Sequence, residues 1–300
     1  MELGVLGPLE LLSDGVRVAL GGPKQRLVLG LLAARRGRVV GLDDLIDGLW
    51  PDGPQARPRK TVQVYVTRLR RALGDSADAI RSEAAGYRFD AGLVPVDADA
   101  FEADVRAAAD EPDDERAVAR LRAALGRWRG DAFDDLRDCA DLVPNAVQLD
   151  ERRLAALYEL FEREVRLRPR DVLAELEQAV EAHPLHEGFA AQLMTAQYRV
   201  GRQADALATF RALRRRLGDE LGLEPGPAVR ELEGRILRHD FPPPRAPASP
   251  QSVVERQRRR VTVVSVELAV ADDAPVDPEV ELALVAPVRR AVRSRIIERG

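Results

Sequence analysis

Residues 59–73 read RKTVQVYVTRLRRAL, and this stretch decides the fold of the chain's first part. On a helical wheel one arc collects the apolar side chains Val62, Tyr65, Val66, Leu69, Ala72 and Leu73. The opposite arc carries cations, an amide, a hydroxyl and one valine: Lys60, Gln63, Val64, Thr67, Arg68 and Arg71. The stretch therefore predicts an amphipathic helix that buries one face and exposes a basic one.

The composition of the exposed face matches what a helix in the DNA major groove needs. Arg and Lys bind phosphates or guanine edges, Gln binds adenine, and an apolar group contacts the thymine methyl. The alternative is a solvated surface helix that is basic without binding DNA. The sequence on either side distinguishes between the two.

The flanks of this helix predict a winged helix-turn-helix. Short strands are expected at 2–6, 9–12 and 16–20, a helix from Pro23 to the stop at Gly37, and a short helix at 42–49 after the link 38–41. After the basic helix, 80–82 and 86–89 are expected to form a hairpin. Strands, three helices and a terminal hairpin in this order place the third helix as the DNA reader and the hairpin as a wing.

Residues 96–240 read as consecutive amphipathic helices. We expect them at 98–109, 113–128, 145–167, 171–182, 186–200, 203–217 and 227–238, with the acidic run 110–115 as a solvated loop. An offset of 34 residues superposes Leu173 on Leu207 and Leu176 on Phe210, which is the period of a tetratricopeptide-type helix pair. The fold class is therefore an α+β winged helix followed by an all-α, tetratricopeptide-like domain that offers a surface to a protein partner.

The composition of the 300-residue chain limits its class. One cysteine excludes an internal disulfide framework, and the first residues, MELGVLGPLELL, lack the pattern of a secretion signal. No apolar run is long enough to span a bilayer, so we expect a protein of the cytoplasm, at the nucleoid. Residues 1–95 carry 14 Lys and Arg against 11 Asp and Glu, within a chain of net charge −4.

No pattern of catalytic residues is present. The sequence GGPKQR at residue 21 lacks the spacing of a phosphate-binding loop, and neither G-x-S-x-G nor H-E-x-x-H occurs. Pro184 separates His183 from His186, which breaks the geometry of a helical ligand pair, so we expect these histidines to cap or lie on the surface. The chain is expected to be no enzyme and to use no metal or cofactor.

A family resemblance rests on three segments: LVLGLLAARRGRVVGLDDLIDGLWPD, TVQVYVTRLRRALG and the closing GYRF. They resemble the effector domain of winged-helix response regulators and, more narrowly, the Streptomyces antibiotic regulatory protein family. The resemblance implies that Val64, Arg68 and Arg70 lie on or beside the DNA-reading face, and that Ser82 stands at a wing position that is usually Thr. Since the chain begins directly with the first strand, we expect no control by aspartyl phosphorylation of a preceding receiver domain.

The helical wheel and the family resemblance together define the candidate DNA-binding residues. Arg70 lies nearer the flank of the helix, so we expect it to bind phosphate. Arg81, Ser82 and Arg88 are expected to brace the wing at the adjacent DNA backbone or minor groove, with plain solvation of the hairpin as the alternative. The full set is Arg59, Lys60, Gln63, Val64, Thr67, Arg68, Arg70, Arg71, Arg81, Ser82 and Arg88.

The segments GRQADAL and LGLEPGPAVREL resemble the bacterial transcriptional activator domain that accompanies this winged helix in the same family. The resemblance implies double-stranded promoter DNA as a partner, a homodimer on DNA, and contact with the sigma or alpha subunit of RNA polymerase. It also implies activation of antibiotic biosynthesis genes through repeated half-sites. The alternative is a helical scaffold or sensor whose winged helix binds protein.

The remaining residues divide into a Pro-rich linker, 241–257, and a segment, 258–300, that is too short to form a domain alone. The latter resembles the opening of a class III nucleotide cyclase homology domain over fewer than fifty residues. Glu267 stands near the usual metal-binding Asp, and AVADDAP lacks the family's Gly and Thr. A second alternative is therefore the N-terminal part of a larger nucleotide-dependent signalling regulator, and cyclase activity is not expected from this chain.

Overall fold

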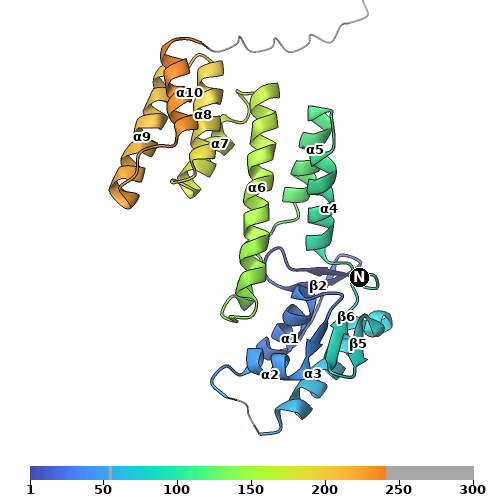
Figure 1. The fold of residues 1–300 in the computed structure, drawn as a ribbon. Helices are drawn as coiled ribbons and strands as arrows, with labels where there is room; N and C mark the ends of the chain where they lie inside the picture. The colour runs from blue at the N-terminus through green and yellow to red at the C-terminus, as the bar shows by residue number, and fades with distance from the viewer. Residues whose placement is uncertain (54–55, 241–300) are drawn as a thin grey trace, which may run out of the picture. The chain divides into compact units, whose positions relative to one another are not determined.

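The computed structural model describes residues 1–53 and 56–240 (Figure 1). The predictions for the linker and for 258–300 concern residues outside these ranges. The chain begins with an antiparallel sheet in the order β1-β2-β3, formed by β1 (Glu2–Gly4), β2 (Glu10–Ser13) and β3 (Val16–Val18). Three helices follow, α1 (Pro23–Ala34), α2 (Leu42–Leu49) and α3 (Pro58–Leu73). The expected winged-helix architecture is confirmed.

The wing is a three-stranded sheet in the order β4-β6-β5. It is built from β4 (Val39–Gly41), β5 (Ile80–Glu83) and β6 (Gly86–Phe89), and the 3₁₀ segment η1 (Gly74–Ala79) leads into it. The expectation that 38–41 is only a link was wrong, because Val40 pairs with Tyr87 in antiparallel register. A side chain at Gly86 would place its Cβ 2.0 Å from the Val40 carbonyl oxygen, so this close approach requires glycine.

The helix α3 forms where the wheel placed it. Pro58 occupies the first turn, where its missing N–H costs nothing, and Gly74 ends the helix at a φ of 54°. The buried side chains recur at helical spacing: Val62, Val66, Leu69 and Leu73. Tyr65 and Ala72 are partly buried beside them.

The second part of the chain is helical, as expected. Its helices are α4 (Asp97–Ala109), α5 (Asp114–Leu125), α6 (Val143–Leu167), α7 (Leu173–Ala182), α8 (Glu187–Arg199), α9 (Gln203–Leu221) and α10 (Pro227–Leu237), with the 3₁₀ turn η2 (Asp134–Leu136) before α6. The helix expected to reach Trp128 ends at Leu125, and α9 runs past its expected end at Leu217. Across residues 1–53 and 56–240, none of the helices combines the length and apolar character needed to cross a membrane.

The 34-residue offset corresponds to equivalent core positions. Leu176 on α7 and Phe210 on α9 are both buried, at 0% and 4% exposure. Between them, α8 contributes Phe189 and Leu193 to the larger core and Met194 to a smaller one that it shares with α9 and α10. One helix therefore serves two cores, which is how stacked helix pairs extend along a chain.

The larger core does not stop at the boundary expected between residues 95 and 96. Leu3 and Phe89 of the winged helix belong to the same buried cluster as Phe101 on α4 and Leu160 on α6. Trp128 closes this cluster with its ring edge-on to Phe101 at 5.4 Å between centroids. The two parts that the sequence separates by composition therefore share one hydrophobic core.

A polar seam accompanies this shared core. The backbone N–H groups of Val5 and Leu6 donate to the Asp97 carboxylate at 2.8 and 3.2 Å, and Arg129 donates to it at 2.9 Å. Burial raises the pKa of Asp97, and these donors oppose the rise. The carbonyl groups of the same two residues accept hydrogen bonds. The backbone N–H of Arg129 donates to the Leu6 carbonyl oxygen at 2.8 Å, and the backbone N–H of Phe133 donates to the Val5 carbonyl oxygen at 2.9 Å.

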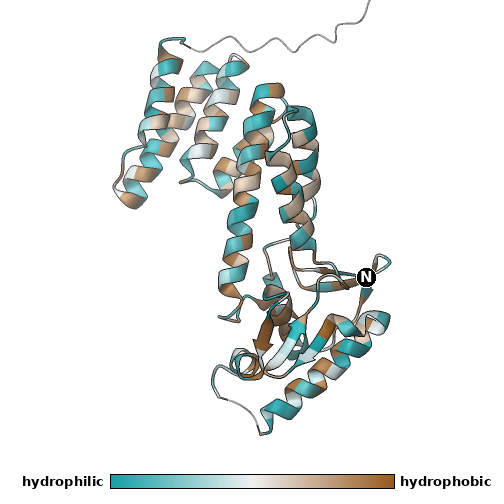
Figure 2. Cartoon of the chain, turned by 45° about the vertical axis from the view of Figure 1, so that its right-hand side comes forward, coloured by the Kyte–Doolittle hydropathy of each residue, from teal (hydrophilic) through white to brown (hydrophobic). Residues whose placement is uncertain are grey.

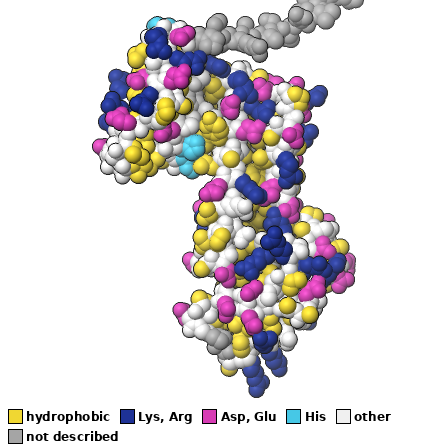
Figure 3. Space-filling view, in the orientation of Figure 1, with side chains coloured by type: hydrophobic (Ala, Val, Ile, Leu, Met, Phe, Trp, Pro, Cys, Tyr) yellow, Lys and Arg dark blue, Asp and Glu magenta, His cyan; other side chains and the backbone are white. Residues whose placement is uncertain are grey.

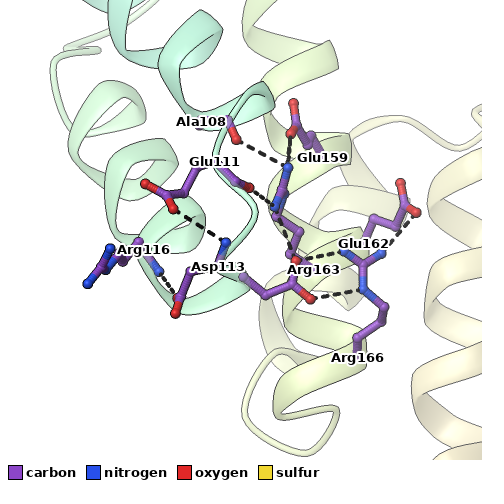
Figure 4. Close-up of polar contacts among 9 residues, drawn as sticks. Ala108, Glu111, Asp113, Arg116, Glu159, Glu162, Arg163 and Arg166 are labelled. Carbon is purple, nitrogen blue, oxygen red and sulfur yellow. Dashed lines mark hydrogen bonds and ion pairs between the residues drawn. The ribbon is translucent and has the colours of Figure 1, made fainter.

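The acidic run 110–115 is not simply a solvated loop (Figure 4). The side chain of Asp113 caps α5 by accepting the Arg116 N–H at 2.9 Å. Asp114 binds both Arg163 and Arg166 of α6, at 3.1 and 3.0 Å. The Arg166 guanidinium, with a smaller contribution from Arg163, lowers the pKa of the Asp114 carboxyl. The α4–α5 hairpin is fastened to α6 here, because Asp114 meets two guanidinium groups of that helix.

His186 caps a helix, as the sequence suggested. Its Nδ1 accepts the Phe189 backbone N–H at 3.2 Å at the start of α8, and its ring stacks on the Phe189 ring at 4.2 Å between centroids. Burial, the largest effect, and the nearby His183 lower the pKa of His186 from its usual 6.5. The cap requires the unprotonated Nδ1, because a protonated ring nitrogen cannot accept a hydrogen bond.

We expect the free energy of unfolding to depend on the protonation of His186. Because its folded-state pKa lies below the unfolded value, its contribution is fully present above pH 6.5 and is lost as pH falls through the folded-state pKa. In His186→Asn the capping oxygen does not titrate in this range, so urea unfolding measured between pH 7.5 and about pH 5 should give a flatter profile. Parallel profiles for the two proteins would contradict this role.

Candidate nucleic-acid interface

One face of α3 is exposed along its whole length. The exposed side chains are Arg59, Lys60, Gln63, Val64, Thr67, Arg68 and Arg71. Val64 is 40% exposed, although valine usually lies inside. In Figure 2 the helix carries hydrophobic and hydrophilic colours side by side, in agreement with its buried and exposed stripes.

Some of the polar groups on this face already form ion pairs or hydrogen bonds within the protein, and others do not. Arg59 forms an ion pair with Asp43 of α2 at 2.6 Å, and the Thr67 hydroxyl donates to the Gln63 carbonyl oxygen at 2.8 Å. Lys60, Arg68 and Arg71 have no acidic group within ion-pair distance among the described residues. These three cations surround the exposed part of α3 and are available to a polyanion.

The first turn of α3 concentrates positive charge where the helix itself is positive. Arg57, Arg59 and Lys60 lie at or before this turn, which contains no acidic residue and no side-chain cap. The unpaired N–H groups of a helix N-terminus carry partial positive charge, so added cations are unfavourable there and an anion is favourable. Figure 3 shows Lys and Arg side chains projecting at the lower end of the molecule. Sequence reasoning missed Arg57, which a search for cations just before the helix-starting Pro58 would have found.

Arg70 points to the wing. Its Nε and Nη2 donate to the Ile80 carbonyl oxygen at 2.9 and 2.7 Å, and Nη2 also donates to the Ser82 hydroxyl oxygen at 2.9 Å. The guanidinium therefore fastens β5 to α3 near the end of the helix. The sequence assigned Arg70 to phosphate and Ser82 to the wing, and the structure brings these two residues together.

Arg81 and Arg88 lie apart from Ser82. They face each other across β5 and β6, and strand alternation places them on the side of the sheet opposite to the side on which Ser82 meets Arg70. Arg81 pairs with Asp90 and Arg88 with Glu83, each at 2.8 Å. The expected trio of wing residues is therefore divided between two faces, and both of its cations are neutralised by acids of the wing.

The fold defines a protein of the winged-helix transcriptional regulatory class. Residues 17–89 match the family described as transcriptional regulatory protein, C terminal, and residues 96–237 match the bacterial transcriptional activator domain. Regulatory protein DnrI of Streptomyces peucetius is 35% identical over 253 residues, which cover 80% of this chain and 93% of DnrI. The chain belongs to the Streptomyces antibiotic regulatory protein family.

A mycobacterial relative adds a solved structure. Transcriptional regulatory protein EmbR of Mycobacterium tuberculosis is 39% identical over 246 residues, covering 79% of this chain and 63% of EmbR. The structure of EmbR in complex with a low affinity phosphopeptide aligns with a TM-score of 0.74 over 79% of this chain and 65% of that chain. The chain thus spans less than two thirds of EmbR.

We expect Arg70→Ala to loosen the wing without removing a DNA contact. The Ile80 carbonyl loses a charged donor, so amide hydrogen exchange in β5 should quicken and unfolding should become easier by about 1–2 kcal/mol. Arg70→Lys should rescue only part of this, because an ammonium cannot bridge the two acceptors as a planar guanidinium does.

The matched control is Arg71→Ala, whose side chain is exposed on the next position of the same helix. If Arg70 instead binds phosphate, its removal should leave β5 exchange unchanged and reduce the salt dependence of DNA binding by about one unit of slope.

Proposed function

We propose that this protein is a sequence-specific DNA-binding transcriptional activator whose α3 lies in the major groove. The observation that carries the proposal is the exposed face of α3, where Lys60, Arg68 and Arg71 meet no acidic partner within the described part of the chain and lie around a solvent-exposed Val64. The major groove admits an α-helix, and the cations and the valine on this face match phosphates, guanine edges and a thymine methyl group.

The residues of α3 divide by role. Lys60, Arg71 and the cations at the first turn, Arg57 and Arg59, hold the phosphate backbone. Gln63, Val64 and Arg68 read bases, and Thr67 contributes the free lone pairs of its hydroxyl. For Arg59 to bind phosphate, its ion pair with Asp43 must open, which costs little at an exposed site.

The role of the wing follows from its charges. Because Arg81 and Arg88 are paired within the sheet, they attract DNA less than free cations would. The wing then contributes mainly through its position, which Arg70 sets through Ile80 and Ser82. On DNA, Arg81 and Arg88 can exchange their acidic partners for phosphates at the adjacent backbone.

The helical domain connects the reader to the transcription machinery. We propose that it joins two protomers on repeated promoter half-sites and contacts RNA polymerase, through its sigma or alpha subunit, at the nucleoid. The family membership and the match to the activator domain support this role. Membership of the Streptomyces antibiotic regulatory protein family supports a target among secondary-metabolite genes.

The test is a gel-shift and footprinting series on the intergenic regions beside the gene, with scrambled DNA at two salt concentrations. We expect Arg68→Ala to weaken binding to promoter DNA by about 1–3 kcal/mol and to relax the sequence preference at one base pair. Arg215→Ala, at an exposed site on α9, provides a control for the loss of one positive charge. Equal affinity of the unaltered protein for promoter and scrambled DNA would contradict the proposal. If Arg68→Ala weakens binding equally on all DNA sequences, Arg68 contacts phosphate rather than a base.

We expect Val64 to contact a thymine methyl group. Replacing the contacted thymine by uracil removes only this methyl group and should weaken DNA binding by the unaltered protein by about 0.5–1 kcal/mol. In Val64→Ala the same base change should cost much less, because the partner of the methyl is already gone. Additive effects of the two changes at every thymine of the footprint would show that Val64 touches none of these methyl groups.

A further inference from the structure

An open groove lies between α6 and α7, away from the DNA-reading helix. It encloses about 690 Å³ and has an apolar floor. The floor is formed by Val147, Leu154, Leu157 and Phe161 of α6, together with Ala179 and Ala182 of α7. The two alanines leave room for another backbone to come close, because small side chains keep the wall of the groove low.

The groove has the dimensions of a helix. Val147 and Phe161 are fourteen positions apart on α6, which corresponds to about 21 Å at a rise of 1.5 Å per residue. The apolar stripe continues beyond the groove to Val143, one turn earlier. Val143 and Val147 are 41% and 45% exposed, so this face of α6 carries branched apolar side chains that no described segment covers.

The rim of the groove is acidic. Its acids are Asp131, Asp150, Glu151 and Glu175, and Arg153 is the one Arg or Lys in its lining, with its guanidinium over the Trp128 ring at 4.9 Å. Asp150 and Glu175 are already bound to Arg137 and Arg122. Glu151 has no ion pair among residues 1–53 and 56–240, and the Asp131 carboxylate, 63% exposed, only approaches Arg137 at 4.0 Å.

We propose that this groove binds a basic amphipathic helix of a partner protein. An apolar stripe at i, i+3, i+7 would fill the floor, and Arg or Lys on its flanks would face Glu151 and Asp131. A second copy of this chain fits less well, because a two-fold contact would set the acidic rim against the same acidic rim. The proposal goes beyond the DNA, protomer and polymerase contacts proposed above, since it assigns a site for a basic helix to one groove of the helical domain.

The probe is a labelled synthetic peptide of about 14 residues with a leucine stripe and arginine flanks, compared with a peptide that carries glutamate in place of arginine. Fluorescence anisotropy with the full chain should give at least about tenfold tighter binding of the arginine peptide. Val147→Asp changes an exposed side chain and should weaken this binding by a similar factor. Ala179→Trp, which fills the groove, should do the same without altering the rim charge.

Two controls make the result specific to the groove. Glu220→Lys changes the net charge by the same amount as Glu151→Lys but lies on α9, so only Glu151→Lys should weaken the arginine peptide. Val147→Asp should leave DNA binding and the melting temperature unchanged, which separates this test from that of the proposed function.

Three outcomes would overturn the proposal. The first is equal binding of the two peptides, and the second is arginine-peptide binding that neither Val147→Asp nor Ala179→Trp affects. The third is a dimer, measured by light scattering, that Val147→Asp dissociates, because the groove would then be occupied by a second copy of the chain.

Discussion

The structure depends on the hydrogen bonds that residues 3–9 make to the helical domain. Asp97 accepts the N–H groups of Val5 and Leu6, and Leu9 donates to Asp135 at 2.6 Å. The donors are backbone N–H groups and the acceptors are side-chain carboxylates, so the position of this segment depends on the two aspartates, and burial beside the shared core strengthens the bonds to Asp97. Val5, Leu6 and Leu9 lie in the connection between β1 and β2, so these bonds attach the first sheet to the helical domain.

The cations of α3 divide into groups that hold the protein together and groups left for a partner. Arg70 belongs to the first kind, because its guanidinium satisfies the Ile80 carbonyl and the Ser82 hydroxyl. Lys60, Arg68 and Arg71 belong to the second. A basic helix thus uses one arginine to hold its own wing, and we propose that the remaining cations bind phosphate and bases.

Much of the fold and part of the site could be predicted from local patterns. The period of Val62, Val66, Leu69 and Leu73 sets the buried face of α3, and with it the exposed face, because an amphipathic helix has one way to bury its apolar stripe. The strand β4 could not be predicted in this way. Its three residues are too few for a local signal, and its pairing partner, β6, lies on the far side of two helices in the chain.

The sequence by itself determined the family, the winged helix, the helical domain and the exposed face of α3, because these follow from periodicity and from contiguous motifs. Only the tertiary structure decided which charges are free. It paired Arg81 with Asp90 and Arg88 with Glu83, turned Arg70 towards Ser82, and joined two parts of the chain in one core. Such pairings depend on distances between residues remote in sequence, and these distances exist only once the chain has folded.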